Sequence, residues 1–106
     1  MALMTGPIAA LVERESTHGV FRKHVEVVLR GVATDDELAE RIALAMQLAA
    51  RARRVDPNVD YETRSRGGRG VAVEFVTDRP DGVKRELDAW VAEQDADVRA
   101  AFEIVR

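Results

Sequence analysis

The residues best suited to chemistry in this chain are one histidine and two glutamates, His24, Glu26 and Glu74. An imidazole beside carboxylates is the smallest group that can transfer protons as a general acid or base, or bind a metal ion weakly. His24 and Glu26 are two residues apart, so their side chains share a face if the segment is a β-strand. The same residues are also typical of a solvated, charged sheet surface. We therefore treat them as a candidate ligand or enzyme site, and we assign no catalytic residue and no metal ligand.

A second set of side chains gathers in the segment Arg64-Ser-Arg66-Gly-Gly-Arg69-Gly70. Arginines around a hairpin tip can bind phosphate, a nucleic-acid backbone or an acidic protein surface. The segment resembles, in a single copy, the Arg-Gly-Gly segments of RNA-binding proteins. The net charge of −3 means that the whole molecule does not attract nucleic acid, so only this patch would bind it. Anion or nucleic-acid binding through Arg64, Arg66 and Arg69 is thus an alternative function and not the favoured one.

Composition excludes or leaves unsupported several other kinds of chemistry. The chain of 106 residues has no cysteine, which excludes disulfides, thiol nucleophiles and thiolate metal sites. No glycine-rich loop precedes a helix pattern and no nucleophile motif is present, so we expect no cofactor, and an enzyme is unsupported. No apolar run approaches the ~20 residues of a membrane span, and the first residues do not resemble a secretory signal. We expect a cytoplasmic protein, or a virion component, that does not bind membranes.

The elements that must position these residues begin with three predicted strands. Val20–Val32 alternates apolar and polar side chains with a period of two, which predicts a strand with the histidine and the first glutamate on its polar face. Val59–Arg66 and Val71–Thr77 predict two more strands, and the glycines at 67 and 68 favour a tight turn between them. A further alternation over Val98–Ile104 predicts a last strand.

Helices are predicted at three places. Thr34 and Glu37 form a capping box that begins a helix ending near Arg54. Pro80 opens a second helix with a regular apolar stripe. Apolar residues at helical spacing in Thr5–Ser16 predict a short amino-terminal helix.

Together these elements predict an α+β domain over residues 20–106, preceded by a helical extension over residues 1–19. The order strand–helix–strand–strand–helix–strand resembles the ferredoxin-like fold, βαββαβ, in which a four-stranded antiparallel sheet carries two helices on one face. The resemblance implies the strand order 4-1-3-2. It places the polar strand Val59–Arg66 at an edge of the sheet, in agreement with its composition.

The first long helix carries the main indication of function, because its apolar arc is wider than one sheet can cover. Ile42 lies on the face of this arc that is expected to pack on the sheet. Leu44 and Leu48 lie on one flank of the arc, and Met46 lies on the other. The open face of the sheet is mostly charged but includes Val28 and Val76. These five residues are the candidate interface.

The favoured hypothesis is a non-enzymatic protein–protein interaction or assembly module. It would act as a homo-oligomer, or as a subunit of a larger complex such as a phage or other particle. Cover of the apolar flanks by the amino-terminal helix of the same chain is the structural alternative. Besides anion binding, a small-molecule or enzyme site on the open sheet face is the other functional alternative.

Overall fold

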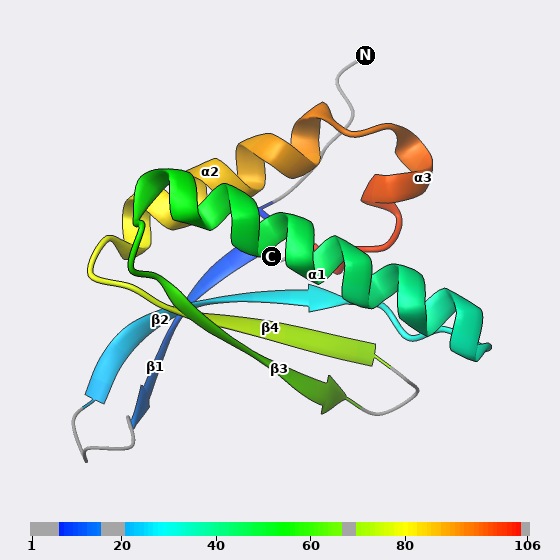
Figure 1. Ribbon diagram of the computed structural model, residues 1–106, viewed down its shortest axis with the longest axis horizontal. Coiled ribbons are helices and arrows are strands. Elements are labelled where there is room, and N and C mark those ends of the chain that lie inside the picture. Colours follow the sequence, from blue (N-terminus) through cyan, green and yellow to red (C-terminus); the bar gives the residue numbers. More distant parts are fainter. Residues whose placement is uncertain (1–6, 16–20, 67–69, 105–106) are drawn as a thin grey trace.

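The computed structural model of the protein describes residues 7–15, 21–66 and 70–104. They form two layers, a four-stranded antiparallel sheet and a layer of helices that covers one of its faces (Figure 1). In chain order the elements are β1 (Ala9–Glu15), β2 (Phe21–Leu29), α1 (Asp35–Val55), β3 (Asp60–Arg66), β4 (Gly70–Val76), α2 (Pro80–Glu93) and α3 (Ala96–Arg99). The strand order is β1-β2-β4-β3. None of the described helices is long and apolar enough to span a membrane.

The α+β class and the antiparallel sheet are confirmed, and β2, β3, β4, α1 and α2 lie where the sequence predicts them. The expected cap begins α1, where Thr34 Oγ1 accepts from the Glu37 N–H at 3.2 Å and the hydroxyl donates to Glu37 Oε1 at 3.0 Å. The predicted turn at glycines 67 and 68 lies outside the described residues, although Arg66 and Gly70 pair on either side of it.

The predicted amino-terminal helix is wrong over the residues that the structure describes, because Ala9–Glu15 is strand β1. It pairs with β2 from Ala9 opposite Val27 to Glu15 opposite Phe21. The short apolar stretch before residue 13 fits a period of two as well as a helical period, so periodicity alone does not separate the two structures. The open edge of β2 decides between them, because pairing there satisfies a row of backbone groups.

The predicted last strand is also wrong, and with it the order 4-1-3-2. Residues Ala96–Arg99 form the short helix α3, capped by Asp95, whose side chain accepts from the Val98 N–H at 3.1 Å. Beyond it the chain makes one isolated bridge, between Phe102 and Leu29, with hydrogen bonds from Arg30 N to Ala101 O at 2.8 Å and from Glu103 N to Val28 O at 2.9 Å. The carboxy-terminal segment therefore continues the edge of β2 where β1 leaves it free. β1 takes the place expected for the last strand.

The core lies between the sheet and the helices. Phe75 from the central strand β4 and Leu48 from α1 are fully buried, and Phe102 is 1% exposed. Trp90 of α2 packs edge-on against Phe102, with ring centroids 6.5 Å apart. The tail after α3 is thus anchored by an aromatic contact although it forms no strand.

Asp56 connects the end of α1 to the loop before α2. Its Oδ1 accepts from Asn58 N–H at 3.0 Å, and its Oδ2 accepts from the Thr77 hydroxyl at 2.6 Å. These bonds, that of Thr77 first, hold the pKa of Asp56 below its ordinary value because they favour the ionised carboxylate. The carboxylate fixes the positions of two connections that are far apart in the sequence.

Candidate functional site

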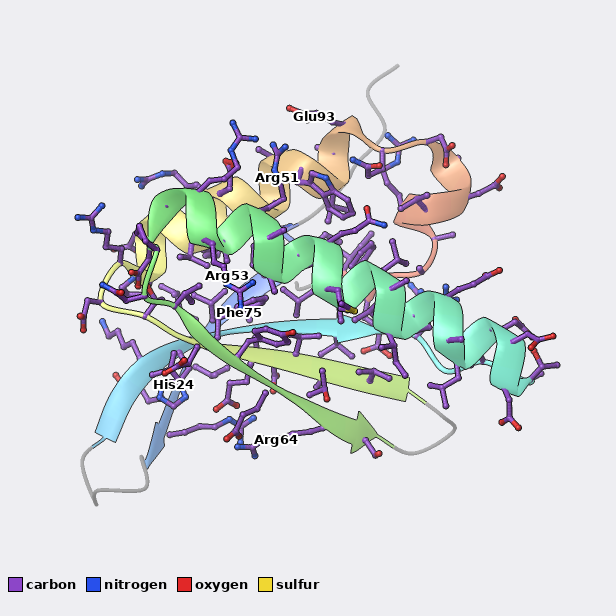
Figure 2. The ribbon with its side chains drawn as sticks, viewed as in Figure 1. His24, Arg51, Arg53, Arg64, Phe75 and Glu93 are labelled. Carbon is purple, nitrogen blue, oxygen red and sulfur yellow. The ribbon has the colours of Figure 1, made fainter. Side chains whose placement is uncertain are left out.

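The face of the sheet that α1 and α2 leave uncovered carries a row of three carboxylates. Glu26 in β2 stands opposite Glu74 in β4, and Glu74 stands opposite Glu62 in β3. Figure 2 shows His24 and Arg64 on this side of the sheet, whereas Phe75 lies between the sheet and the helices. Like charges directly opposite each other in neighbouring strands repel, so this row requires compensation.

Cationic and hydrogen-bonding side chains from three strands compensate the row. His24 Nδ1 lies 2.7 Å from Glu74 Oε1. Arg14 in β1 donates to Glu26 Oε2 at 2.9 Å and makes an ion pair from Nε to Glu74 Oε2. Arg64 lies 3.6 Å from Glu74. The central carboxylate, only 3% exposed, thus has partners on β1, β2 and β3.

The structure brings His24 and Glu74 together as the sequence suggested, and it links Glu26 to them through Arg14. A carboxylate that is hydrogen-bonded to Nδ1 orients an imidazole and leaves its Nε2 atom available for proton transfer or metal binding. His24 Nε2 is buried and has no hydrogen-bond partner among the described residues, and His24 is 4% exposed. Within the described part of the chain no group of acidic or histidine side chains has the arrangement of a metal site. The geometry is that of a polar network that neutralises buried charge, and an enzyme site on this face gains no support from it.

Of the three arginines proposed for anion binding, Arg64 is the one whose side chain the structure describes. Arg64 lies on the open face beside Glu62 and Glu74, at 3.9 Å and 3.6 Å. Arg66 ends β3, and nothing is described of its side chain. Arg69 lies outside the described residues.

The candidate interface residues divide between core and surface. Leu48 is fully buried, so it contacts no partner in this conformation, and Leu44 packs half-buried against the core. Val28 and Val76 are half-buried on the open face of the sheet. Met46 is 61% exposed.

One exposed apolar residue was missed, because Ile42 is expected from the sequence to face the sheet but is 47% exposed. The reason is the direction in which α1 lies. Its opposite flank faces α2, as the contact of 3.4 Å between Arg51 and Glu86 shows. The flank with Ile42 and Met46 also carries Arg53 at helical spacing, and the Arg53 guanidinium lies 5.9 Å from the centre of the Tyr61 ring in β3. The two apolar side chains therefore lie on the flank of α1 that faces away from α2 and toward β3.

β3 is an edge strand, and its far side has no partner among the described residues. Thr63 and Ser65, which alternate with the residues of the open face and so belong to the helix side of the sheet, are both exposed. We call the free edge of β3, together with Ile42 and Met46 of α1, the β3 side. It combines unpaired backbone groups with exposed apolar side chains, the two features that sheets and helices normally cover.

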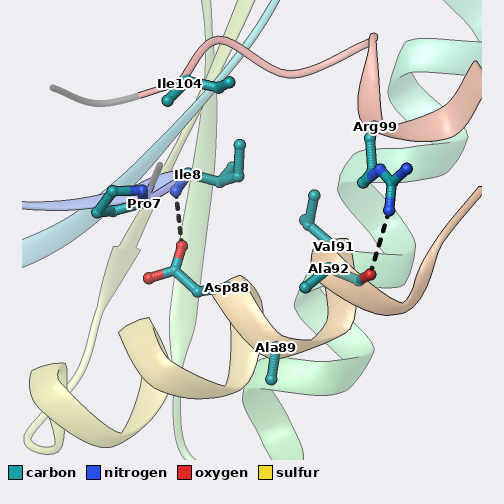
Figure 3. Close-up of a pocket in the computed structure, with 8 residues that line it drawn as sticks. All are labelled: Pro7, Ile8, Asp88, Ala89, Val91, Ala92, Arg99 and Ile104. Carbon is teal, nitrogen blue, oxygen red and sulfur yellow. Dashed lines mark hydrogen bonds between the residues drawn. The ribbon is translucent and has the colours of Figure 1, made fainter. Parts of the chain in front are cut away.

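A cleft of about 400 Å³ lies between α2 and the two ends of the described chain (Figure 3). Its main polar group, Asp88, accepts from Ile8 N–H at 2.7 Å and Ala9 N–H at 2.8 Å and pairs with Lys84 at 2.9 Å. The Arg99 guanidinium points to the carbonyl of Ala92. These polar groups are occupied by contacts that hold β1 and α3 on α2, so the cleft offers little to a ligand.

The sequence did not point to Arg14 or Asp88, because Arg14 lies in β1 and Asp88 binds the start of β1, and this strand was not predicted.

No family model, curated protein or solved structure matches this chain. Its function therefore has to be inferred from its own residues.

Proposed function

We propose that the protein is a non-enzymatic assembly module that associates with itself through the β3 side. The observation that carries the proposal is the exposure of Ile42 and Met46, at 47% and 61%, on the flank of α1 above an unpaired sheet edge. The β3 side is the region where exposed large apolar residues of a helix and a free strand edge occur together among the described residues. The polar network on the open face and the occupied cleft supply no comparable reason for a ligand to bind.

Self-association would bury the exposed apolar side chains of α1 and would pair the free backbone groups of β3. Burial of an Ile or Met side chain contributes about 1.5–3 kcal/mol when it is complete. Addition of a strand to a sheet edge supplies main-chain hydrogen bonds as well, and these give such contacts their affinity. Neither term requires a catalytic group or a cofactor.

The first test is the absolute mass of the protein, measured by size-exclusion chromatography with light scattering over a range of concentrations. We expect the wild type to form a defined oligomer. The double variant Ile42→Glu/Met46→Glu should be a monomer, because two charges in the contact must lose water without partners. Circular dichroism of the variant should be unchanged, since both side chains lie on the surface.

Ile104→Glu is the matched control. Ile104 is 41% exposed but lies beside the cleft next to α2, away from β3. Its variant should keep the wild-type mass. A wild type that stays monomeric at every concentration, or a double variant with the wild-type mass, would contradict the proposal.

A further inference from the structure

We infer that the partner on the β3 side is a second copy whose β3 lies antiparallel to the first, with Thr63 of each copy at the two-fold axis. This inference rests on the proposed function and specifies its geometry. The result is one continuous sheet across both copies. This arrangement is inferred from the order of acidic and basic residues along β3.

The strand reads Asp60-Tyr-Glu-Thr-Arg-Ser-Arg66, with acidic residues in its first half and basic residues in its second half. In an antiparallel pair centred on Thr63, Glu62 stands opposite the second copy's Arg64, and Asp60 stands opposite its Arg66. Two-fold symmetry repeats both pairs. Opposite charges in directly opposed positions stabilise neighbouring strands. Charged edge strands normally resist pairing, but here every cross-strand charge meets its opposite.

Other registers lack this match. A shift of two residues in one direction places Glu62 opposite Glu62, and a shift in the other direction places Arg64 opposite Arg64, with like charges at the axis. A shift of one residue turns one copy over, since opposed residues share a face of the sheet. Registers shifted by an even number of residues keep the helices of both copies on the same side, where Ile42 and Met46 of each copy approach the other. Among these registers, the one centred on Thr63 pairs every charge of the strand with its opposite.

The side chains of Glu62 and Arg64 are exposed, and Arg64, which also contacts Glu74 at 3.6 Å, has several N–H donors to share between partners. Glu62 has a side chain that is 71% exposed, and its ion-pair contact among the described residues is the one of 3.9 Å to Arg64. Arg64 has a side chain that is 49% exposed. The second copy's Arg64 would extend the row Glu26, Glu74 and Glu62 with a positive charge, at the end of the row that is least compensated.

Charge exchange tests the pairing. Glu62→Arg alone and Arg64→Glu alone each place like charges opposite each other twice, and each should weaken self-association about ten-fold or more. An equimolar mixture of the two variants should form a heterodimer at wild-type affinity, because every arginine of one strand then stands opposite an aspartate or a glutamate of the other. Native mass spectrometry distinguishes the heterodimer, and circular dichroism verifies that each variant folds.

A cysteine scan tests the register without altering charge. The chain has no cysteine, so each variant carries one thiol. Thr63→Cys should form a disulfide-linked dimer on mild oxidation, because the two thiols meet at the axis. Ser65→Cys is the matched control on the same face of the strand, and it stands opposite Tyr61, so it should stay monomeric on a non-reducing gel.

The outcomes separate this inference from the proposal on which it rests. If Ile42→Glu/Met46→Glu dissociates the oligomer, assembly through the β3 side holds. The register is nevertheless wrong if both charge variants keep wild-type affinity, or if Ser65→Cys forms a disulfide-linked dimer as readily as Thr63→Cys. A monomeric wild type overturns both.

Discussion

Glu74 is the carboxylate of the open sheet face that most needs compensating partners, because it is buried beside two other glutamates. Its carboxylate is nearly inaccessible and has Glu26 and Glu62 on either side of it. A buried carboxylate without compensation is strongly destabilising, whereas one with cationic and hydrogen-bonding partners is tolerated. His24, Arg14 and Arg64 therefore act chiefly as its partners.

The Arg14→Ala variant measures this role. We expect it to lower the free energy of unfolding by about 1–2 kcal/mol, since the ion pair is lost but Arg14 is partly exposed to screening water. Urea denaturation gives the value. Adding Glu74→Gln to Arg14→Ala should recover part of the loss, because the uncompensated charge is removed.

The control for this cycle is Glu13→Ala, a neighbouring exposed residue in β1, which should change stability by less than about 0.5 kcal/mol. Equal stability of Arg14→Ala and wild type would show that the network does not depend on β1.

At the scale of the elements, Asp56 joins two connections and makes their stability depend on pH. Its folded pKa lies below its unfolded value because of the hydrogen bonds from Thr77 and Asn58. The stabilisation is therefore fully present above the unfolded pKa and is lost as the pH falls through the folded pKa, in the region below about pH 4.

Asp56→Asn should destabilise the protein at neutral pH and flatten its loss of stability in acid. Thermal unfolding of both proteins between pH 7 and pH 3 compares the two slopes. Asp97→Asn, at an exposed position in α3, is a suitable control for removal of one negative charge. Parallel pH profiles for Asp56→Asn and wild type would refute the role of this carboxylate.

The accuracy of sequence-based prediction also differs between elements. α1, α2 and the strands β2, β3 and β4 carry clear periods or caps, and they are predicted correctly. The segment before Glu13 is apolar and short, so its structure depends on the free edge of β2, which no local pattern reveals. In the candidate site, the period of two brings His24 and Glu74 to one face, but the contribution of Arg14 requires β1. The exposure of Ile42 requires knowledge of which flank of α1 faces α2.

At the scale of the whole molecule, one edge of β2 is shared by segments from opposite ends of the described chain. β1 covers the stretch up to Val27, and the residues around Phe102 cover the rest. Asp88 adds a contact to Ile8 across 80 residues of sequence. Contacts that close such long loops cost chain entropy before they contribute stability, which slows folding.

Hydrogen exchange should therefore report two levels of protection. The amides of Arg30 and Glu103, which bond across this shared edge, should exchange through partial opening, whereas those of Val73 and Phe75 in the central strand should require global unfolding. Equal protection at all four amides would argue against separate opening. The same order should apply while the chain is being synthesised. The interior of the sheet can form early, but the edge of β2 is complete only after about one hundred residues are available. This edge is therefore the last part of the fold to form.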